Sequence, residues 1–378
     1  PTEWGKDRNI RWRTELNGTG NSSPIVIEGR VFVTVARDEG AKRNLICFDR
    51  QTGKELWTRT VEWTKNEVTH QTNKWCGSTP AATKDHVVVW HGSAGLYCYT
   101  LDGEELWSTD LGKFEHMWGY GSSPVIHEGM VYLQCGPGVN TFMAGIGLAD
   151  GELKWKTEEP GGVDEGSPRM VGSWSTPLVV DVDGQQQLVS SLPTRVVSYD
   201  LQTGEILWTV DGLTSVRGDL VYSSMVVAGD VGVAMGGFRG PVLGFRLGGR
   251  GDVTGQNRLW HEIEGQPVRI GSGVVVDGTL YMANAGPGTA QAIDINTGEV
   301  LWQDRLRGNH WGSIVMADGL LYATDQKSNT HVFRPSREKF DVVQVNSLNE
   351  PSNSTPAISD NEIFLRTAEA LYCVSTAE

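Results

Sequence analysis

Aromatic, basic and imidazole side chains recur just before the segments of this chain that contain Ser-Thr-Pro or a related tripeptide. Indole rings stack on sugar rings and flat heterocycles, guanidinium groups clamp carboxylates, and imidazoles titrate near neutral pH. Residues of these types at one recurring position could form a funnel that binds a partner or a polar ligand. The candidate ligand-binding residues are Trp75, Trp118, Arg169, Trp174, Arg217, Asp219, Arg269, His310 and Trp311.

Acid–base chemistry has three candidates at the same recurring position. Glu115 and His116 are adjacent in the sequence, and His310 directly precedes Trp311. The alternative for each is a residue that packs within its loop, so the sequence assigns no catalytic role. The three histidines that could bind a metal, His70, His116 and His310, have different sequence contexts and lack the close spacing of a metal site. No metal is therefore expected.

The composition restricts the classes of partner. The chain has 378 residues and a formal net charge of −14, so it has no overall field that attracts nucleic acid or anionic lipid. No apolar run approaches the roughly 18 residues that a membrane-spanning helix needs. The chain starts at Pro1 without a basic and then apolar leader. This start leaves either a cytoplasmic protein or an exported protein whose signal segment has been removed.

A repeat indicates the elements that must position these residues. Its clearest copies read small residue, apolar residue, Asp, two residues, Thr-Gly, three residues, Trp, at residues 47–57, 198–208 and 292–302. Degenerate copies end at Trp107, Trp155 and Trp260. A Ser-Thr-Pro-like element precedes the copies and begins eight times, at Ser22, Ser78, Ser122, Ser175, Ser223, Gly271, Gly312 and Ser354. The spacing of about 41 to 56 residues matches one four-stranded propeller blade.

The repeats predict an all-β fold, an eight-bladed β-propeller of four-stranded antiparallel blades that forms a single domain over residues 1–378. In the first blade we expect strands at residues 22–27, 30–35, 44–49 and 54–60. Trp12 lies in a segment (9–16) that has the pattern of an outer strand without preceding inner strands. The last repeat has only three strands. The N-terminal strand is therefore expected to complete the last blade and close the ring, which removes exposed sheet edges.

The repeat resembles the tryptophan-docking motif of quinoprotein-type propellers, which are built from PQQ-like repeats. In that family the Trp stacks between blades over a small residue. The resemblance implies that Cys47, Cys98 and Cys373, three of the five cysteines, are small buried residues and not redox groups. The seventh repeat departs from the motif, because it lacks Thr-Gly and has Val342 or a neighbour in place of the Trp.

Among such propellers, the length, the Ser-Thr-Pro starts and the eight blades resemble the BamB-like exported propellers. This resemblance implies a monomeric, non-catalytic scaffold that is periplasmic or extracellular and binds a partner at the Trp/His/Arg-rich funnel. It leaves open whether the chain carries a membrane anchor before processing. The alternative is a protein or enzyme that binds a carbohydrate or another small polar ligand there. Quinoprotein dehydrogenases are longer and have a disulfide between adjacent cysteines, which this chain lacks. No cofactor is therefore predicted, and PQQ with calcium is the less favoured interpretation.

Overall fold

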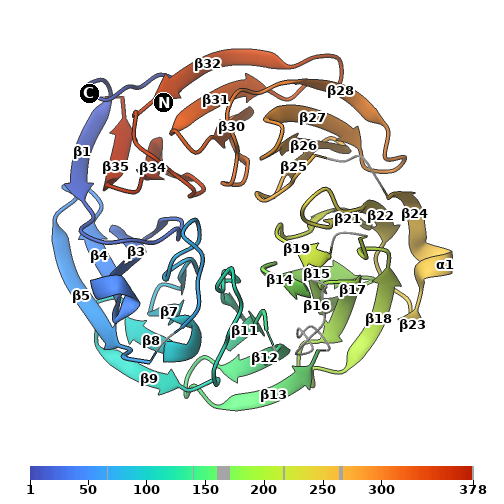
Figure 1. The fold of residues 1–378 in the computed structure, drawn as a ribbon, viewed down its shortest axis with the longest axis horizontal. Helices are drawn as coiled ribbons and strands as arrows, with labels where there is room; N and C mark the ends of the chain where they lie inside the picture. Colours follow the sequence, from blue (N-terminus) through green and yellow to red (C-terminus); the bar gives the residue numbers. More distant parts are fainter. Residues whose placement is uncertain (66, 139, 160–170, 216–217, 264–266, 377–378) are drawn as a thin grey trace. The chain divides into compact units, whose positions relative to one another are not determined.

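The computed structural model describes residues 1–65, 67–138, 140–159, 171–215, 218–263 and 267–376. The chain divides into two compact units, which are described separately. The first contains residues 1–124, 310–335 and 341–378, and the second contains residues 125–309 and 336–340. The described residues form the eight antiparallel blades of an all-β propeller, as the repeats predict (Figure 1).

The first unit contains the first, second, seventh and eighth blades. From the inner to the outer strand, the first blade consists of β2 (Ile25–Ile27), β3 (Arg30–Arg37), β4 (Lys42–Asp49) and β5 (Glu55–Glu62), and the second of β6 (Ala81–Ala82), β7 (His86–Trp90), β8 (Leu96–Thr100) and β9 (Glu105–Thr109). The seventh blade consists of β29 (Val315–Ala317), β30 (Leu320–Thr324), β31 (Asn329–Arg334) and β32 (Asp341–Ser347). The eighth consists of β33 (Ala357–Ser359), β34 (Glu362–Arg366), β35 (Ala370–Ser375) and β1 (Ile10–Glu15). Two 3-10 turns, Asp38–Gly40 and Gly92–Ala94, follow β3 and β7.

The second unit contains the third to sixth blades. The third blade consists of β10 (Val125–His127), β11 (Met130–Cys135), β12 (Phe142–Gly147) and β13 (Leu153–Glu158), and the fourth of β15 (Leu178–Val182), β16 (Gln185–Ser191), β17 (Arg195–Asp200) and β18 (Ile206–Asp211). The fifth blade consists of β20 (Val226–Ala228), β21 (Val231–Met235), β22 (Val242–Arg246) and β24 (Arg258–Glu262). The sixth consists of β25 (Val274–Val276), β26 (Thr279–Ala283), β27 (Thr289–Asp294) and β28 (Val300–Arg305). Further elements are the parallel pair β14 (Val171–Ser173) and β19 (Asp219–Val221), the strand β23 (Gly251–Asp252) added in parallel to β18, and the short helix α1 (Thr254–Asn257).

The inner strand of the first blade begins at Ile25, three residues later than predicted. The preceding Ser-Ser-Pro segment forms hydrogen bonds outside the strand ladder. The Ser22 hydroxyl accepts the Thr34 N–H at 3.0 Å, and the Ser23 N–H donates to the Thr79 hydroxyl of the second blade at 2.9 Å. Proline has no N–H to donate to a strand ladder. The segment therefore links neighbouring blades instead of extending the sheet.

The repeated tryptophans dock blades onto one another. Each small residue of the repeat pairs directly opposite its Trp on the neighbouring strand, as Cys47 does with Trp57. The Trp57 Nε1–H then donates to the Leu101 carbonyl of the second blade at 3.0 Å. Equivalent bonds join Trp12 to Arg50, Trp155 to Leu201, Trp260 to Ile295 and Trp302 to Ser336. The docking role inferred from the repeat is confirmed for these tryptophans.

The Asp and Gly residues of the repeat shape the turn that receives the next indole. The Asp49 carboxylate accepts bonds from the Thr52 hydroxyl at 2.7 Å and the Thr52 N–H at 2.8 Å, which lower its pKa. Gly204 has a φ of +70°, and a Cβ there would overlap the Trp155 ring. Glycine is therefore required both by the backbone and by the docked indole.

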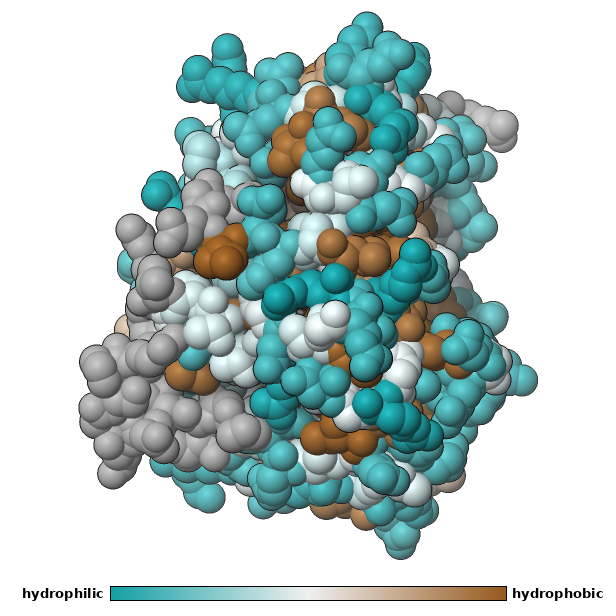
Figure 2. Space-filling model, turned by 90° about the vertical axis from the view of Figure 1, so that its right-hand side faces the viewer, coloured by the Kyte–Doolittle hydropathy of each residue, from teal (hydrophilic) through white to brown (hydrophobic). Residues whose placement is uncertain are grey.

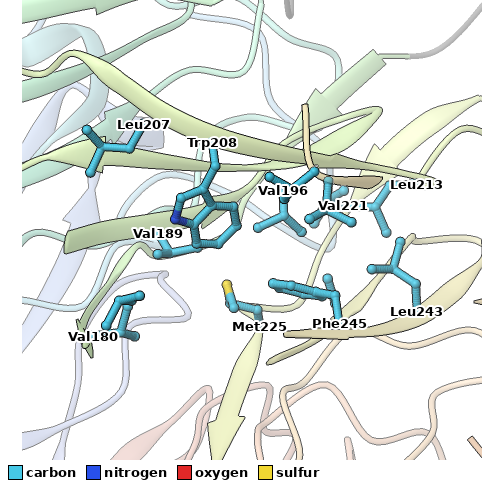
Figure 3. Close-up of a cluster of buried hydrophobic side chains, with 14 residues drawn as sticks. Val180, Val189, Val196, Leu207, Trp208, Leu213, Val221, Met225, Leu243 and Phe245 are labelled. Atoms are coloured by element: carbon cyan, nitrogen blue, oxygen red, sulfur yellow. The ribbon is translucent and has the colours of Figure 1, made fainter. Parts of the chain in front are cut away.

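Trp208 departs from this arrangement. Its Nε1–H donates to the Gln187 side chain of its own blade at 2.8 Å, and the ring is completely buried. Figure 3 shows the indole packed with Val189 from its own blade and with Met225 and Phe245 from the next. Trp208 therefore docks by apolar packing alone.

The N-terminal segment completes the last blade, as predicted. β1 pairs antiparallel with β35, which places Trp12 opposite Cys373. The sequence did not predict the role of Trp4, which is 4% exposed and stacks on Tyr322 of the seventh blade with ring centroids 6.5 Å apart. In the seventh blade, Gln344 occupies the register position of the Trp, and Val342 is 41% exposed. Trp4 therefore supplies the buried indole that this repeat lacks.

Many of the exposed apolar residues lie on the outer strands of several blades. Leu153, Ile206 and Val300 are each more than a third exposed at or near the start of an outer strand. On the face drawn in Figure 2, hydrophobic residues form separate patches among hydrophilic ones. The outer surface on that side therefore shows the mixed character of an ordinary protein surface.

Candidate functional site

In the first unit, a buried ion pair holds the loop that carries Trp75. Arg43, which is fully buried, pairs with Glu67, which is 7% exposed and follows the outer strand of the first blade. Glu67 also accepts the Ser93 hydroxyl of the second blade at 2.8 Å. The Arg43 guanidinium donates to the backbone carbonyl of His91. The ion pair therefore ties the loop to the interior of the protein.

Trp75 itself packs against the hairpin that connects β3 and β4. A Cβ on Gly40 would overlap the Trp75 ring, so the indole covers this glycine directly. The side chain is half-buried. One face of the indole is therefore committed to packing.

Glu115 and His116 have different surroundings although they are adjacent in the sequence. Glu115 is exposed and pairs with Lys113 at 2.6 Å. His116 is 7% exposed, and its Nδ1 accepts the Trp118 N–H at 3.2 Å. Its ring lies 5.9 Å from the partly exposed Trp118 ring. His116 thus supports the turn that presents Trp118.

A chain of side-chain amides connects five loops of the first unit. Gln326 donates to Asn353 at 2.8 Å, and Asn353 donates to Asn21 at 3.4 Å. Asn21 donates to the carbonyl of Thr72 at 2.9 Å. The Asn73 amide continues the chain with bonds to the carbonyls of Trp118 and Tyr120, at 2.8 and 3.0 Å. The loops that carry Trp75 and Trp118 are thereby tied to each other.

His310 and Trp311 lie at the start of the seventh blade. His310 is completely buried, and its ring centroid is 5.9 Å from that of His331. Burial lowers the pKa of His331, although Asp325 acts in the opposite direction. Trp311 is half-buried. The imidazoles therefore form a buried pair of which at least His331 favours the neutral form.

In the second unit, the structure places Trp174, Asp219 and Arg269 in packed surroundings. Trp174 lies 5.5 Å from the Tyr222 ring, and its backbone extends the β14–β19 pairing. Asp219 is 8% exposed. Arg269 is 1% exposed and donates to Gln291 at 3.1 Å, and burial lowers its pKa to about 10. The remaining two predicted residues, Arg169 and Arg217, lie outside the described residues.

The cysteines have the surroundings of buried apolar residues. All five are free and buried. Burial raises the pKa of Cys47, Cys98 and Cys373 to about 12, so their thiols are protonated at neutral pH. Within the described ranges, no group of three or more His, Cys, Asp or Glu side chains is arranged to hold a metal ion. In that same part of the chain, no helix has the length and apolar character needed to cross a membrane.

Buried glutamates after outer strands are the residues that sequence reasoning missed. Besides Glu67, Glu159 accepts Arg195 at 3.1 Å and the Tyr199 hydroxyl. Glu350 accepts Arg13 at 3.1 Å and the Tyr372 hydroxyl at 2.6 Å, and it also accepts the Thr367 hydroxyl. In each case the next blade supplies a hydrogen bond. The only signal in the sequence is a glutamate at a similar place after several outer strands.

Glu350 makes stability depend on acid pH. Burial alone would raise its pKa, but hydrogen bonds from Thr367, Tyr372 and Arg13 outweigh burial and lower it. A depressed carboxyl pKa stabilises the fold above the unfolded-state pKa, and this contribution disappears as pH falls through the folded-state pKa. We expect Glu350→Gln to cost about 1–3 kcal/mol at pH 7 and progressively less toward pH 3. Thermal unfolding of both proteins between pH 3 and 7 tests this, and a cost that does not change with pH would contradict it.

The blades, their docked tryptophans and the small residues opposite them define a propeller of PQQ-like repeats. The family model described as outer membrane protein assembly factor BamB matches residues 3–74, 41–303 and 249–339. The chain belongs to this family. No curated protein matches the sequence significantly.

Solved structures with the same fold have diverse functions. BamB from Moraxella catarrhalis is similar over 97% of both chains, with a TM-score of 0.65 and 12% identity. Quinohemoprotein alcohol dehydrogenase from Comamonas testosteroni is similar over 98% of this chain and 77% of its own, with a TM-score of 0.71 and 13% identity. A computationally designed protein has a TM-score of 0.64 at 13% identity, over 96% of this chain and 98% of its own. At these identities the likeness shows the fold alone.

Proposed function

We propose that this protein is an exported, non-catalytic scaffold of the BamB type, which binds a partner protein through two loops of the first unit. These loops, residues 63–80 and 110–124, precede the inner strands of the second and third blades. The observation that carries the proposal is the combination of contacts that hold these loops in place with an exposed apolar tip. The amide chain and the Arg43–Glu67 pair hold the loops, while Met117 at the tip is 53% exposed.

Loops that are held by such contacts and carry exposed Met and Trp side chains favour protein recognition. Such side chains are enriched at protein interfaces, and a loop that is already ordered loses little entropy on binding. Met117 and Trp118 are adjacent, and both are accessible to a partner at least in part. They supply the apolar contact area expected at the core of a protein interface.

The placement of the titratable candidates favours binding over catalysis. A general base must be within hydrogen-bond reach of the proton that it abstracts. His310 is completely buried, the Nδ1 of His116 accepts a backbone N–H, and Glu115 pairs with Lys113. These contacts support structural roles for the three residues. The family description supports an exported location.

Site-specific crosslinking tests the proposed surface. A photoreactive amino acid at position 117 is expected to crosslink to a component of the outer-membrane protein assembly machinery in intact cells. The matched control is the same probe at Leu153, an exposed apolar position (46%) on an outer strand. The crosslinked protein is identified by mass spectrometry. An adduct pattern at position 117 that equals the pattern at position 153 would refute the proposed surface.

Met117→Asp is expected to weaken partner binding at least 10-fold, since it places a charge in the apolar centre of the contact. The melting temperature should stay within about 1 °C of the wild type, because Met117 is largely exposed. Leu153→Asp serves as the control for added charge and should leave binding unchanged. Titration of the purified partner by isothermal calorimetry provides the affinity. Equal affinity of the Met117→Asp and wild-type proteins would exclude this loop from the interface.

A sugar or another small polar ligand is the second candidate, favoured by the half-exposed indoles of Trp118 and Trp311. Indole faces stack on sugar rings, and neighbouring amides bind hydroxyl groups. A screen of saccharides by thermal unfolding separates the two candidates. A rise in melting temperature that Trp118→Ala abolishes would favour the ligand, whereas no rise with any saccharide would leave the scaffold as the better account.

A further inference from the structure

Arg366, at the end of β34, is a buried cation with no acidic partner. The side chain is 3% exposed, and its Nη1 donates to Ser22 in the first blade, to the carbonyl oxygen at 2.9 Å and to the hydroxyl at 2.6 Å. Its Nε is buried and has no hydrogen-bond partner among the described residues. Within the same part of the chain, no Asp or Glu lies at ion-pair distance from it. One guanidinium is therefore only partly satisfied between the eighth and first blades.

Three other arginines that are buried or partly buried in the first unit have carboxylate partners. The pairs are Arg43 with Glu67, Arg13 with Glu350 at 3.1 Å, and Arg50 with Glu362 at 2.7 Å. An uncompensated buried charge costs several kcal/mol, so proteins pair such groups or bind a counter-ion. Arg366 therefore differs from these arginines, whose charges the protein itself neutralises.

The neighbouring thiol does not provide the missing negative charge. Cys76 is completely buried, and its charge would interact with those of Arg43 and Arg366. Burial raises the pKa of the Cys76 thiol to about 11, despite the opposite effect of both arginines. Burial lowers the pKa of Arg366 to about 10. At neutral pH the arginine is therefore charged and the thiol is neutral.

The surroundings of Arg366 offer further hydrogen-bond donors. The Ser78 hydroxyl is completely buried and has no hydrogen-bond partner in the described part of the chain. Thr34 connects the serines, since its N–H donates to the Ser22 hydroxyl at 3.0 Å and its hydroxyl donates to the Ser78 carbonyl at 3.3 Å. A Cβ on Gly20 would lie 2.7 Å from Arg366 Nη2. That Cβ would also lie 3.0 Å from the carbonyl oxygens of Cys76 and Thr34, so the glycine backbone packs closely against the guanidinium.

We propose that Arg366 binds a small monovalent anion, of the size of chloride or formate, between the eighth and first blades. The guanidinium supplies the charge, and the hydroxyls of Ser22 and Ser78 are the additional donors. A small anion suits an enclosed site because it needs few partners and little space. The bound anion would join the two blades at the point where the N-terminal strand completes the propeller. The proposal is independent of the partner-binding function.

Thermal unfolding in different sodium salts at equal ionic strength tests the site. Gluconate, which is too large to enter, serves as the reference anion. In chloride or formate, the wild-type melting temperature is expected to rise with anion concentration by on the order of 2–4 °C. Arg366→Met should lose this response. Arg246→Met is the matched control, because Arg246 is exposed and should leave the response unchanged.

Bromide provides a second readout that does not require a variant. Crystals of the wild-type protein soaked in bromide should show an anomalous scattering peak within hydrogen-bond distance of the Arg366 guanidinium. A peak there supports the proposal, whatever the size of the thermal response. The absence of this peak together with equal melting temperatures in chloride and gluconate would overturn it. An anion response that persists in Arg366→Met, without the peak, would also overturn it.

Discussion

Glu67→Gln is expected to destabilise the first unit by about 3–5 kcal/mol, because it leaves the Arg43 charge buried without a counter-charge. Arg43 is fully buried and Glu67 is 7% exposed, so water cannot replace the lost partner. The substitution also weakens the bond from Ser93, which connects the loop after β5 to the second blade. Chemical denaturation monitored by tryptophan fluorescence measures the change.

The matched control is Glu55→Gln in β5, the outer strand that precedes the loop containing Glu67. Glu55 is exposed and accepts only the Thr58 hydroxyl, so its replacement should cost less than about 0.5 kcal/mol. A double variant, Arg43→Met with Glu67→Leu, should recover most of the stability lost in Glu67→Gln, since it removes both charges. A cost below about 1 kcal/mol for Glu67→Gln alone would show that the pair does not hold the loop.

Trp208→Ala is expected to cost about 3–5 kcal/mol, the usual range for large buried aromatic residues. The ring is completely buried between the fourth and fifth blades, with Phe245 at a centroid distance of 6.1 Å (Figure 3). Removing it leaves a cavity that both blades line and also leaves the Gln187 side chain without its indole donor. Denaturant unfolding of the wild-type and variant proteins measures the difference.

Two further variants separate packing from hydrogen bonding at this position. Trp208→Phe keeps an aromatic ring but loses the bond to Gln187, so it should cost less than the alanine variant. Trp302→Ala removes a docking indole that is only half-buried, and it should cost less than Trp208→Ala because less apolar surface is lost from the interior. If Trp208→Ala and Trp302→Ala had the same effect, burial between blades would not be the source of the stability.

The repeat allowed most of the blade structure to be predicted from sequence. A hairpin turn, a small residue and a Trp at constant spacing involve contacts within one blade or with the next. The Asp49 turn and the opposition of Cys47 and Trp57 are examples. The residue that takes the place of the docking Trp in the seventh blade was not predictable in this way. Trp4 reaches it from the far end of the chain, and its backbone bonds to Asn346, 342 residues away.

The candidate site could be predicted only as a set of loops. The sequence indicated which residues precede the inner strands, but the residue types did not indicate which side chains are buried and which are exposed. His310 and Arg269 proved to be buried, whereas Met117, which carries no polar chemistry and was not a candidate, is 53% exposed. Side chains in a loop adopt whatever contacts the neighbouring blades offer. Pairs such as Arg43 and Glu67 have no fixed spacing that a repeat could disclose.

The sequence by itself therefore determined the number of blades, the docking tryptophans and the completion of the last blade by the N-terminal strand. These features depend on short-range spacing that recurs from blade to blade. Only the tertiary structure decided which charges are buried, which have partners and which loop tips face solvent. Those properties arise where separate blades meet, and the free energy of a charge or an indole depends on the neighbours that it meets there.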